Sequence, residues 1–203
     1  MKPSVYTRPA KPLRIPVRRR ADFEPVGARE VPEIVAVDKA TECHVTPPEV
    51  ARRMVRYLGP VGDFLTLEPS AGTGNLVRAL LDSGHSRYEL CTVERHHALV
   101  EQCARAGLGV PIQRCFLEWA EEVRGKVEFP RVLMNPPFRE VGKHVAAARS
   151  LLGRGGHDGP PVLVALVPVT FEREPGAEVL EYLDETTFAT ARVRTKIIRF
   201  LGN

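Results

Sequence analysis

The residues best suited to do chemistry in this chain are the tetrapeptide Asn135-Pro136-Pro137-Phe138. Two consecutive prolines hold the backbone extended and remove two N–H donors, so nearby carbonyls stay available as acceptors. The side-chain carbonyl of Asn135 and the backbone carbonyl of Pro136 can together accept both hydrogens of a planar amino group. Such contacts move the nitrogen towards sp3 geometry and free its lone pair for an electrophilic methyl group. Phe138 adds a flat face on which a base can stack.

A second chemical feature is a glycine-rich turn that begins with an acid, Glu68-Pro69-Ser70-Ala71-Gly72-Thr73-Gly74. Glycine lets a ligand approach the backbone closely, and the N-terminus of a following helix offers free N–H groups. Val77 stands in the third glycine position of the dinucleotide fingerprint, and Glu68 would repel a pyrophosphate. A carboxylate instead suits a cationic amino group, such as that of S-adenosylmethionine. Glu94 is placed to accept hydrogen bonds from a ribose diol.

The apolar pattern provides a framework that can position both features. From about residue 36, short apolar runs typical of buried strands alternate with stretches of helical spacing. The pattern predicts strands at 64–67, 90–94, 110–112, 131–134 and 162–167, and helices at 49–58, 75–82, 97–106, 117–123 and 141–152. Two further β-rich segments, 187–193 and 196–201, follow one another without a helix and predict a hairpin. We therefore expect an α/β fold with a doubly wound, mostly parallel sheet and a terminal antiparallel hairpin.

Both chemical features directly follow predicted strands, at the edge where open α/β sheets bind ligands. Upstream of them, Thr46 is predicted to cap the helix at 49–58, with Pro47 at its first position. Further along, His144 and Trp119 are interpreted as packed residues. Four basic residues near the end are expected either on a solvated edge strand or facing nucleic acid: Arg192, Arg194, Lys196 and Arg199.

The composition is typical of a globular protein, with 43% hydrophobic and 27% charged residues in 203. No stretch approaches the roughly 20 apolar residues of a membrane span, and the N-terminus lacks the apolar region of a secretory signal. The four cysteines have no C-x-x-C spacing, so we expect reduced thiols in a cytoplasmic protein. We expect no metal site and no contact with a membrane.

The net charge of +4 belongs to the N-terminal end, where residues 1–20 contain seven basic residues and no acid. Prolines recur throughout residues 1–35, and proline at this density prevents helix and sheet. We therefore expect a basic, extended, disordered arm at 1–35 and a catalytic domain at 36–203. Arginines on an extended backbone can bind the phosphates of a nucleic acid. A leader that only increases solubility is the alternative interpretation.

The motifs and their order resemble those of the S-adenosylmethionine-dependent N6-adenine DNA methyltransferases, in the gamma-class arrangement. In that family a T-P-P helix start comes first, the glycine motif second and N-P-P-[FY] last. This chain has Thr46-Pro47-Pro48, then residues 68–74, then residues 135–138. The resemblance spans about residues 40–170 and implies a class I methyltransferase, Rossmann-like fold. It also implies methyl transfer to the N6 amine of adenine in DNA, with the base flipped out of the duplex.

The resemblance implies a role for each motif residue. Thr46 and Pro47 would close over the methionine end of the cofactor, and Arg95 would lie beside its adenine ring. The implied cofactor site consists of Thr46, Pro47, Glu68, Pro69, Ser70, Ala71, Gly72, Gly74, Glu94, Arg95, Cys115, Phe116 and Asn135. The implied catalytic residues, which hold the target amine and base, are Asn135, Pro136, Pro137 and Phe138.

The chain departs from the family at Cys115, where an aspartate usually contacts the adenine amine of the cofactor. A thiol is a weak acceptor, so that hydrogen bond is expected to be lost or replaced by Glu118. No module that reads a DNA groove is visible after Phe138, because the remaining residues are needed for the catalytic fold. We therefore expect low sequence specificity, or recognition by the basic arm or by a partner subunit.

Three other functions remain open on the sequence. N-P-P-[FY] also occurs in enzymes that methylate an amine of a base in RNA. It occurs as well in enzymes that methylate a glutamine amide in protein. A third possibility is a methyltransferase fold without turnover that binds nucleic acid or a partner.

Overall fold

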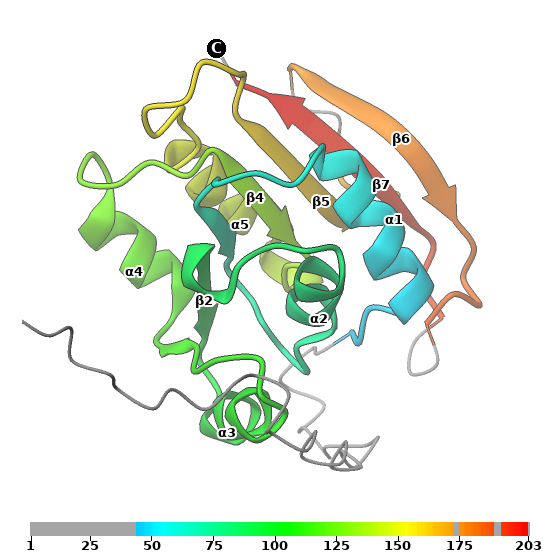
Figure 1. The fold of residues 1–203 in the computed structure, drawn as a ribbon. Helices are drawn as coiled ribbons and strands as arrows, with labels where there is room; N and C mark the ends of the chain where they lie inside the picture. The colour runs from blue at the N-terminus through cyan, green and yellow to red at the C-terminus, as the bar shows by residue number, and fades with distance from the viewer. Residues whose placement is uncertain (1–43, 173–174, 189–191, 203) are drawn as a thin grey trace, which may run out of the picture. The chain divides into compact units, whose positions relative to one another are not determined.

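A computed structural model describes residues 44–172, 175–188 and 192–202, which form a seven-stranded sheet with helices on both faces (Figure 1). The predicted basic arm, residues 1–35, lies outside the described residues. No helix within the described ranges is long and apolar enough to cross a membrane. The helices and strands are α1 (Pro48–Leu58), β1 (Thr66–Glu68), α2 (Asn75–Asp82), η3 (Arg87–Glu89), β2 (Leu90–Glu94), α3 (His97–Arg105), β3 (Ile112–Gln113), α4 (Phe116–Val123), β4 (Arg131–Met134), η4 (Phe138–Glu140), α5 (Val141–Ser150), β5 (Val162–Pro168), β6 (Ala177–Leu183) and β7 (Thr195–Leu201).

The strand order is β3-β2-β1-β4-β5-β7-β6. The first five strands in this order pair in parallel, and β7 pairs antiparallel with both β5 and β6. The sheet therefore has the expected doubly wound, mostly parallel form with a C-terminal antiparallel hairpin. The winding reverses between the adjacent strands β1 and β4. The crevice outside the carboxyl ends of strands at such a switch point is where open α/β sheets bind ligands.

The central strand β5 shows why the sheet needs helices on both faces. All seven of its residues are buried. Val164 and Leu166 belong to a hydrophobic cluster with α1 and α2, whereas Leu163 and Ala165 belong to a second cluster with α4 and α5. Because both faces are covered, the strand is apolar throughout instead of alternating with polar residues. Trp119 belongs to the second cluster, which confirms its predicted place in the core.

The first strand of the terminal hairpin was predicted in the wrong place. The hairpin partner of β7 is β6, whereas the described residues of segment 187–193 form no strand. Charged residues at Glu178 and Glu181 and a register shift between Val179 and Glu181 interrupt the alternation that marks a strand. Such charges and bulges are typical of an edge strand, which must avoid pairing with other chains. Phe188, in the segment that was predicted as a strand, instead packs in the hydrophobic cluster with residues of α1.

The basic residues near the end of the chain do not all lie on an exposed edge, because β7 lies between two other strands. Lys196 is buried, and its Nζ donates to the backbone carbonyls of Val169 at 3.3 Å and Phe171 at 2.7 Å. Arg199 pairs with Glu178 across the hairpin at 2.7 Å. The expected solvated position is therefore wrong for Lys196, whereas the Arg199 side chain remains 30% exposed and Arg192 and Arg194 are exposed.

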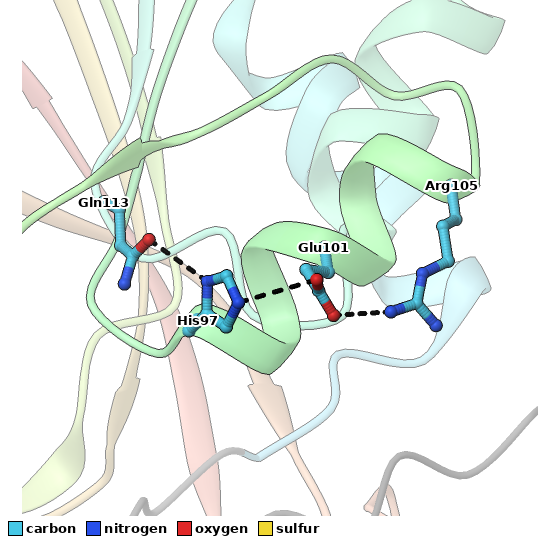
Figure 2. A network of polar contacts seen from close by, with 4 residues as sticks. All are labelled: His97, Glu101, Arg105 and Gln113. Carbon is cyan, nitrogen blue, oxygen red and sulfur yellow. Dashed lines mark hydrogen bonds and ion pairs between the residues drawn. The ribbon is translucent and has the colours of Figure 1, made fainter.

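An exposed polar network links α3 to the edge strand β3 (Figure 2). His97 Nδ1 lies 3.3 Å from Gln113 Oε1, and His97 Nε2 lies 3.5 Å from Glu101 Oε1. Glu101 also binds Arg105 one turn further along the helix. Because these side chains are largely exposed, each pair contributes at most about 1 kcal/mol of stability.

Candidate active site

A cavity of about 230 Å³ opens where segments that follow four parallel strands meet. Its walls are Pro69, Ser70, Gly72, Glu94, Arg95, His96, Leu99, Arg114, Cys115, Phe116, Leu117, Asn135, Pro137, Arg139, Glu140 and His144. A smaller cavity of about 40 Å³ is lined by His44, Val45, Thr46, Ser70, Ala71, Gly72, Thr73, Asn75, Leu76 and Asn135. The two cavities share Ser70, Gly72 and Asn135, so they adjoin at the glycine turn and the N-P-P-F tetrapeptide.

Most of the residues predicted for the site are brought together in these walls. Five of them line neither cavity: Pro47, Glu68, Gly74, Pro136 and Phe138. Glu68 is buried beside Ser70, and Gly74 is buried at the start of α2. Pro47 precedes the first residue of α1, Pro136 is buried, and Phe138 is half-buried in η4. Several lining residues were not predicted from the sequence, including His44, Arg114 and His144.

The buried side chain of Glu94 fastens the glycine turn to the end of β2. Its Oε2 accepts a hydrogen bond from the Gly72 backbone N–H at 2.9 Å, and its Oε1 accepts one from the His96 N–H at 2.8 Å. Each carboxylate oxygen can accept a second hydrogen bond, so a ribose diol remains a suitable ligand. Glu94 therefore shapes the cavity wall in addition to lining it.

Replacing Glu94 by alanine is expected to destabilise the protein as well as to weaken ligand binding. The backbone N–H groups of Gly72 and His96 would lose their acceptors, at a cost of about 1–3 kcal/mol each if they stay buried. Chemical denaturation of the ligand-free protein would measure the loss. Glu118→Ala changes the same residue type at an exposed position outside the cavity lining and serves as the control. Unchanged stability of the Glu94 variant would contradict this bracing role.

Gly74 is required by close packing under the same turn. It has φ of +84°, in the left-handed region that side chains rarely adopt. A Cβ there would lie 2.4 Å from Leu108 Cδ1 and 3.2 Å from Cys103 Sγ. This second glycine of the motif therefore lets α2 begin close to the segment that follows α3.

Glu68 has a free, buried carboxylate oxygen. Its Oε1 accepts a hydrogen bond from the Ser70 N–H at 3.2 Å, and its Oε2 has no hydrogen-bond partner among the described residues. Burial raises the pKa of Glu68 well above 4.5; the Ser70 N–H opposes this shift, and the nearby charge of Glu94 adds to it. A buried acid without a counter-charge is costly for stability, so it suits a site that receives a cation.

The amide of Asn135 is held in one orientation by the segment before α1. Its Nδ2 lies 2.7 Å from the His44 backbone carbonyl and 3.0 Å from Thr46 Oγ1. A carbonyl only accepts hydrogen bonds, so the amide nitrogen, and not the oxygen, must face His44. Asn135 Oδ1 is then buried without a partner among the described residues. Thr46 does not cap α1 as predicted, because its side chain binds Asn135 instead.

One face of Phe138 is covered by an aromatic side chain from the same segment. The rings of His44 and Phe138 stack with centroids 4.6 Å apart and an interplanar angle of 29°. Phe188 meets Phe138 edge to face, with centroids 6.4 Å apart. The surroundings of Phe138 thus accommodate a flat nitrogen heterocycle.

The wall after β3 lacks the strong acceptor that the resemblance led us to look for. Cys115 precedes α4 at the N-cap position and makes no side-chain capping bond. Glu118 is exposed and is not among the lining residues, so the predicted replacement by Glu118 finds no support. Phe116, by contrast, is buried in this wall, where it offers an apolar ring.

The backbone is similar to those of solved methyltransferases, although no family model and no curated protein matches the sequence. It matches yhhF, a methyltransferase candidate from Escherichia coli, with a TM-score of 0.57 at 16% identity, over 78% of this chain and 88% of that one. It matches the methyltransferase subunit of a type I restriction-modification system from Streptococcus thermophilus with a TM-score of 0.61 at 15% identity, over 79% and 45%. The chain has a methyltransferase fold.

A third solved structure, also from a type I restriction system, matches with similar identity and coverage. The M protein of the type I restriction enzyme EcoKI has a TM-score of 0.59 at 16% identity, over 80% of this chain and 44% of that one. This chain therefore spans less than half the length of the two restriction-system subunits. At these identities the likeness establishes the methyltransferase fold, while the substrate must be argued from the site.

Proposed function

We propose that this protein is an S-adenosylmethionine-dependent methyltransferase that modifies the N6 amine of adenine in DNA. The free oxygen of Asn135 carries this proposal. Because the N–H groups of its amide are bound to His44 and Thr46, its Oδ1 is left as a fixed, desolvated acceptor. An amino group, which has two hydrogens to donate, is the natural partner of such an acceptor.

The residues present fit S-adenosylmethionine, which supplies an electrophilic methyl group when bound. Glu68, which binds Ser70 in the wall shared by both cavities, would attract the cationic methionine end. Glu94 would hold the ribose with its remaining acceptor capacity. Phe116 would pack against the adenine ring with its apolar face.

The target base would stack on Phe138. His44 covers one face of that ring in this conformation, so we propose that the base displaces the imidazole there. A base inside a duplex cannot reach this position and would have to be flipped out. Asn135 would then accept one amine hydrogen, and the Pro136 carbonyl would accept the other.

The chain's own contribution to catalysis would be positioning. Holding the amine through Asn135 and Pro136 keeps its lone pair directed at the methyl donor, which can lower the barrier by several kcal/mol. S-adenosylmethionine would supply the methyl group with its sulfur as the leaving group, while Asn135 and Pro136 would hold the attacking nitrogen in line. One amine proton is then released to solvent, so no strong base is required.

DNA as substrate and a partner subunit are supported by the two restriction-system proteins, which are named as parts of restriction enzymes. The basic arm at 1–35 is proposed to bind phosphates. A partner subunit is proposed to supply the recognition of a target sequence.

Transfer of a tritiated methyl group from S-adenosylmethionine to separate pools of DNA, RNA and protein tests the proposed function. We expect labelled DNA, with N6-methyladenine as the modified nucleoside in mass analysis. Label in RNA alone or in protein alone would contradict DNA as the substrate. Absence of S-adenosylmethionine binding by calorimetry would favour a binding module without turnover.

A further inference from the structure

His144 is a buried polar residue that the proposed function does not yet use. It lies on α5, is 8% exposed, and lines the larger cavity. Its Nδ1 has no hydrogen-bond partner among the described residues. Its ring centroid lies 5.8 Å from that of Phe116, with an interplanar angle of 32°. A histidine that served packing alone would be expected to pair this nitrogen, because an unpaired buried polar atom destabilises the fold.

Beside Phe116, against which the purine is proposed to pack, the neighbouring lining residue Cys115 is not a strong acceptor. Cys115, beside Phe116, offers only a thiol, which is a weak hydrogen-bonding group. Burial lowers the pKa of His144, so its imidazole is neutral at pH 7 and has one nitrogen able to accept. Glu140 opposes this shift, and Arg95 and Lys143 reinforce it. The cavity thus pairs a weak acceptor at Cys115 with an available one at His144.

We propose that His144 recognises the purine of the cofactor by accepting a hydrogen bond from its 6-amino group, in place of an acidic residue at position 115. This inference rests on the proposed use of S-adenosylmethionine. In this arrangement Phe116 contacts the purine with an apolar ring, and His144 reads its polar edge. Selectivity for adenine then comes from α5, the helix that follows the catalytic tetrapeptide, and not from the segment after β3.

Calorimetry with two ligands tests this assignment: S-adenosylhomocysteine, and its analogue with hydrogen in place of the 6-amino group. We expect the wild-type protein to bind the adenine form about fivefold more tightly, the value of one ordinary hydrogen bond. His144→Phe keeps a ring of similar shape but removes the acceptor, so the ratio of the two affinities should fall to about one. His144→Gln restores an acceptor on a flexible side chain and should retain most of the ratio.

Cys115→Asp provides an independent arm of the test. An aspartate at this N-cap position would offer a carboxylate to the cavity and could also cap α4. Introduced together with His144→Phe, it should raise the ratio again. A merely structural role of His144 would change both affinities equally and leave the ratio unchanged.

The outcomes separate this inference from the proposed function. A His144→Phe protein that melts cooperatively and keeps the wild-type ratio would overturn the role of His144. If His144→Phe does not fold, a wild-type ratio near one would overturn it equally. If the wild-type protein binds neither ligand, the proposed cofactor itself is wrong.

Discussion

Replacing Asn135 by alanine is expected to lower the rate of methyl transfer by about 100-fold or more, while cofactor affinity falls by less than about tenfold. The variant removes Oδ1, one of the two acceptors proposed to hold the target amine, and leaves only the Pro136 carbonyl. Single-turnover transfer of a labelled methyl group to DNA measures the rate, and calorimetry with S-adenosylmethionine measures the affinity. Parallel loss of both would mean that Asn135 has a structural role.

Asn75 offers a matched control for this experiment. Its Nδ2 donates to the Thr46 backbone carbonyl at 2.8 Å, so both asparagines hold the same segment. Only Asn135 also has a buried oxygen without a partner. Asn75→Ala should therefore lower the rate by less than about tenfold, through loosening of the segment alone. A rate as low as that of the Asn135 variant would show that the segment, and not the acceptor, limits the reaction.

Replacing Glu68 by glutamine is expected to weaken cofactor binding by about 10- to 100-fold, the value of one hydrogen bond to a charged group. The same change should stabilise the ligand-free protein at pH 8, because it removes the cost of burying an acid near Glu94 that is ionised in the unfolded chain. A gain of about 1 kcal/mol would raise the melting temperature by about 2–4 °C. Improved stability together with lost binding is the signature of a residue kept for function.

The pH dependence of the stability of the ligand-free protein follows from the direction in which the pKa of Glu68 is shifted. The pKa of Glu68 is raised above its unfolded value, so the folded protein favours the protonated acid. The stability this preference contributes is fully present below pH 4.5 and is lost as the pH rises through the raised pKa. The gain in stability of Glu68→Gln over the wild type should therefore be greatest at high pH and should vanish towards pH 4.

Melting curves across this pH range, and calorimetry with S-adenosylmethionine, provide the measurements. Wild-type affinity should also fall as the pH drops through the raised pKa, because a cationic ligand needs the ionised carboxylate. Glu118→Gln makes the same chemical change on an exposed residue beside the cavity and should alter neither quantity appreciably. A Glu68→Gln protein that binds the cofactor as well as the wild type does would refute the assigned role.

Residue types and their spacing sufficed to predict the candidate site residues and the kind of sheet that positions them. Strand and helix periodicities are local, so the apolar runs sufficed to predict the parallel strands and their helices. The motifs were predicted directly after the first and fourth strands, and Glu68 does end β1 while Asn135 follows β4. That these two strands are neighbours came from the structure. Prediction failed where charged residues and a bulge hid the edge strand β6.

The surroundings of the tetrapeptide Asn135-Pro136-Pro137-Phe138 depend on contacts between segments that are distant in the chain. Which end of the Asn135 amide faces the cavity depends on His44, 91 residues away in the chain. The stacking of His44 on Phe138, the bracing by Glu94 and the burial of His144 also join distant segments. Residue types and spacing predict which polar groups line a site. Whether a group such as Asn135 Oδ1 has a free lone pair depends on the hydrogen bonds that distant segments make in the folded chain.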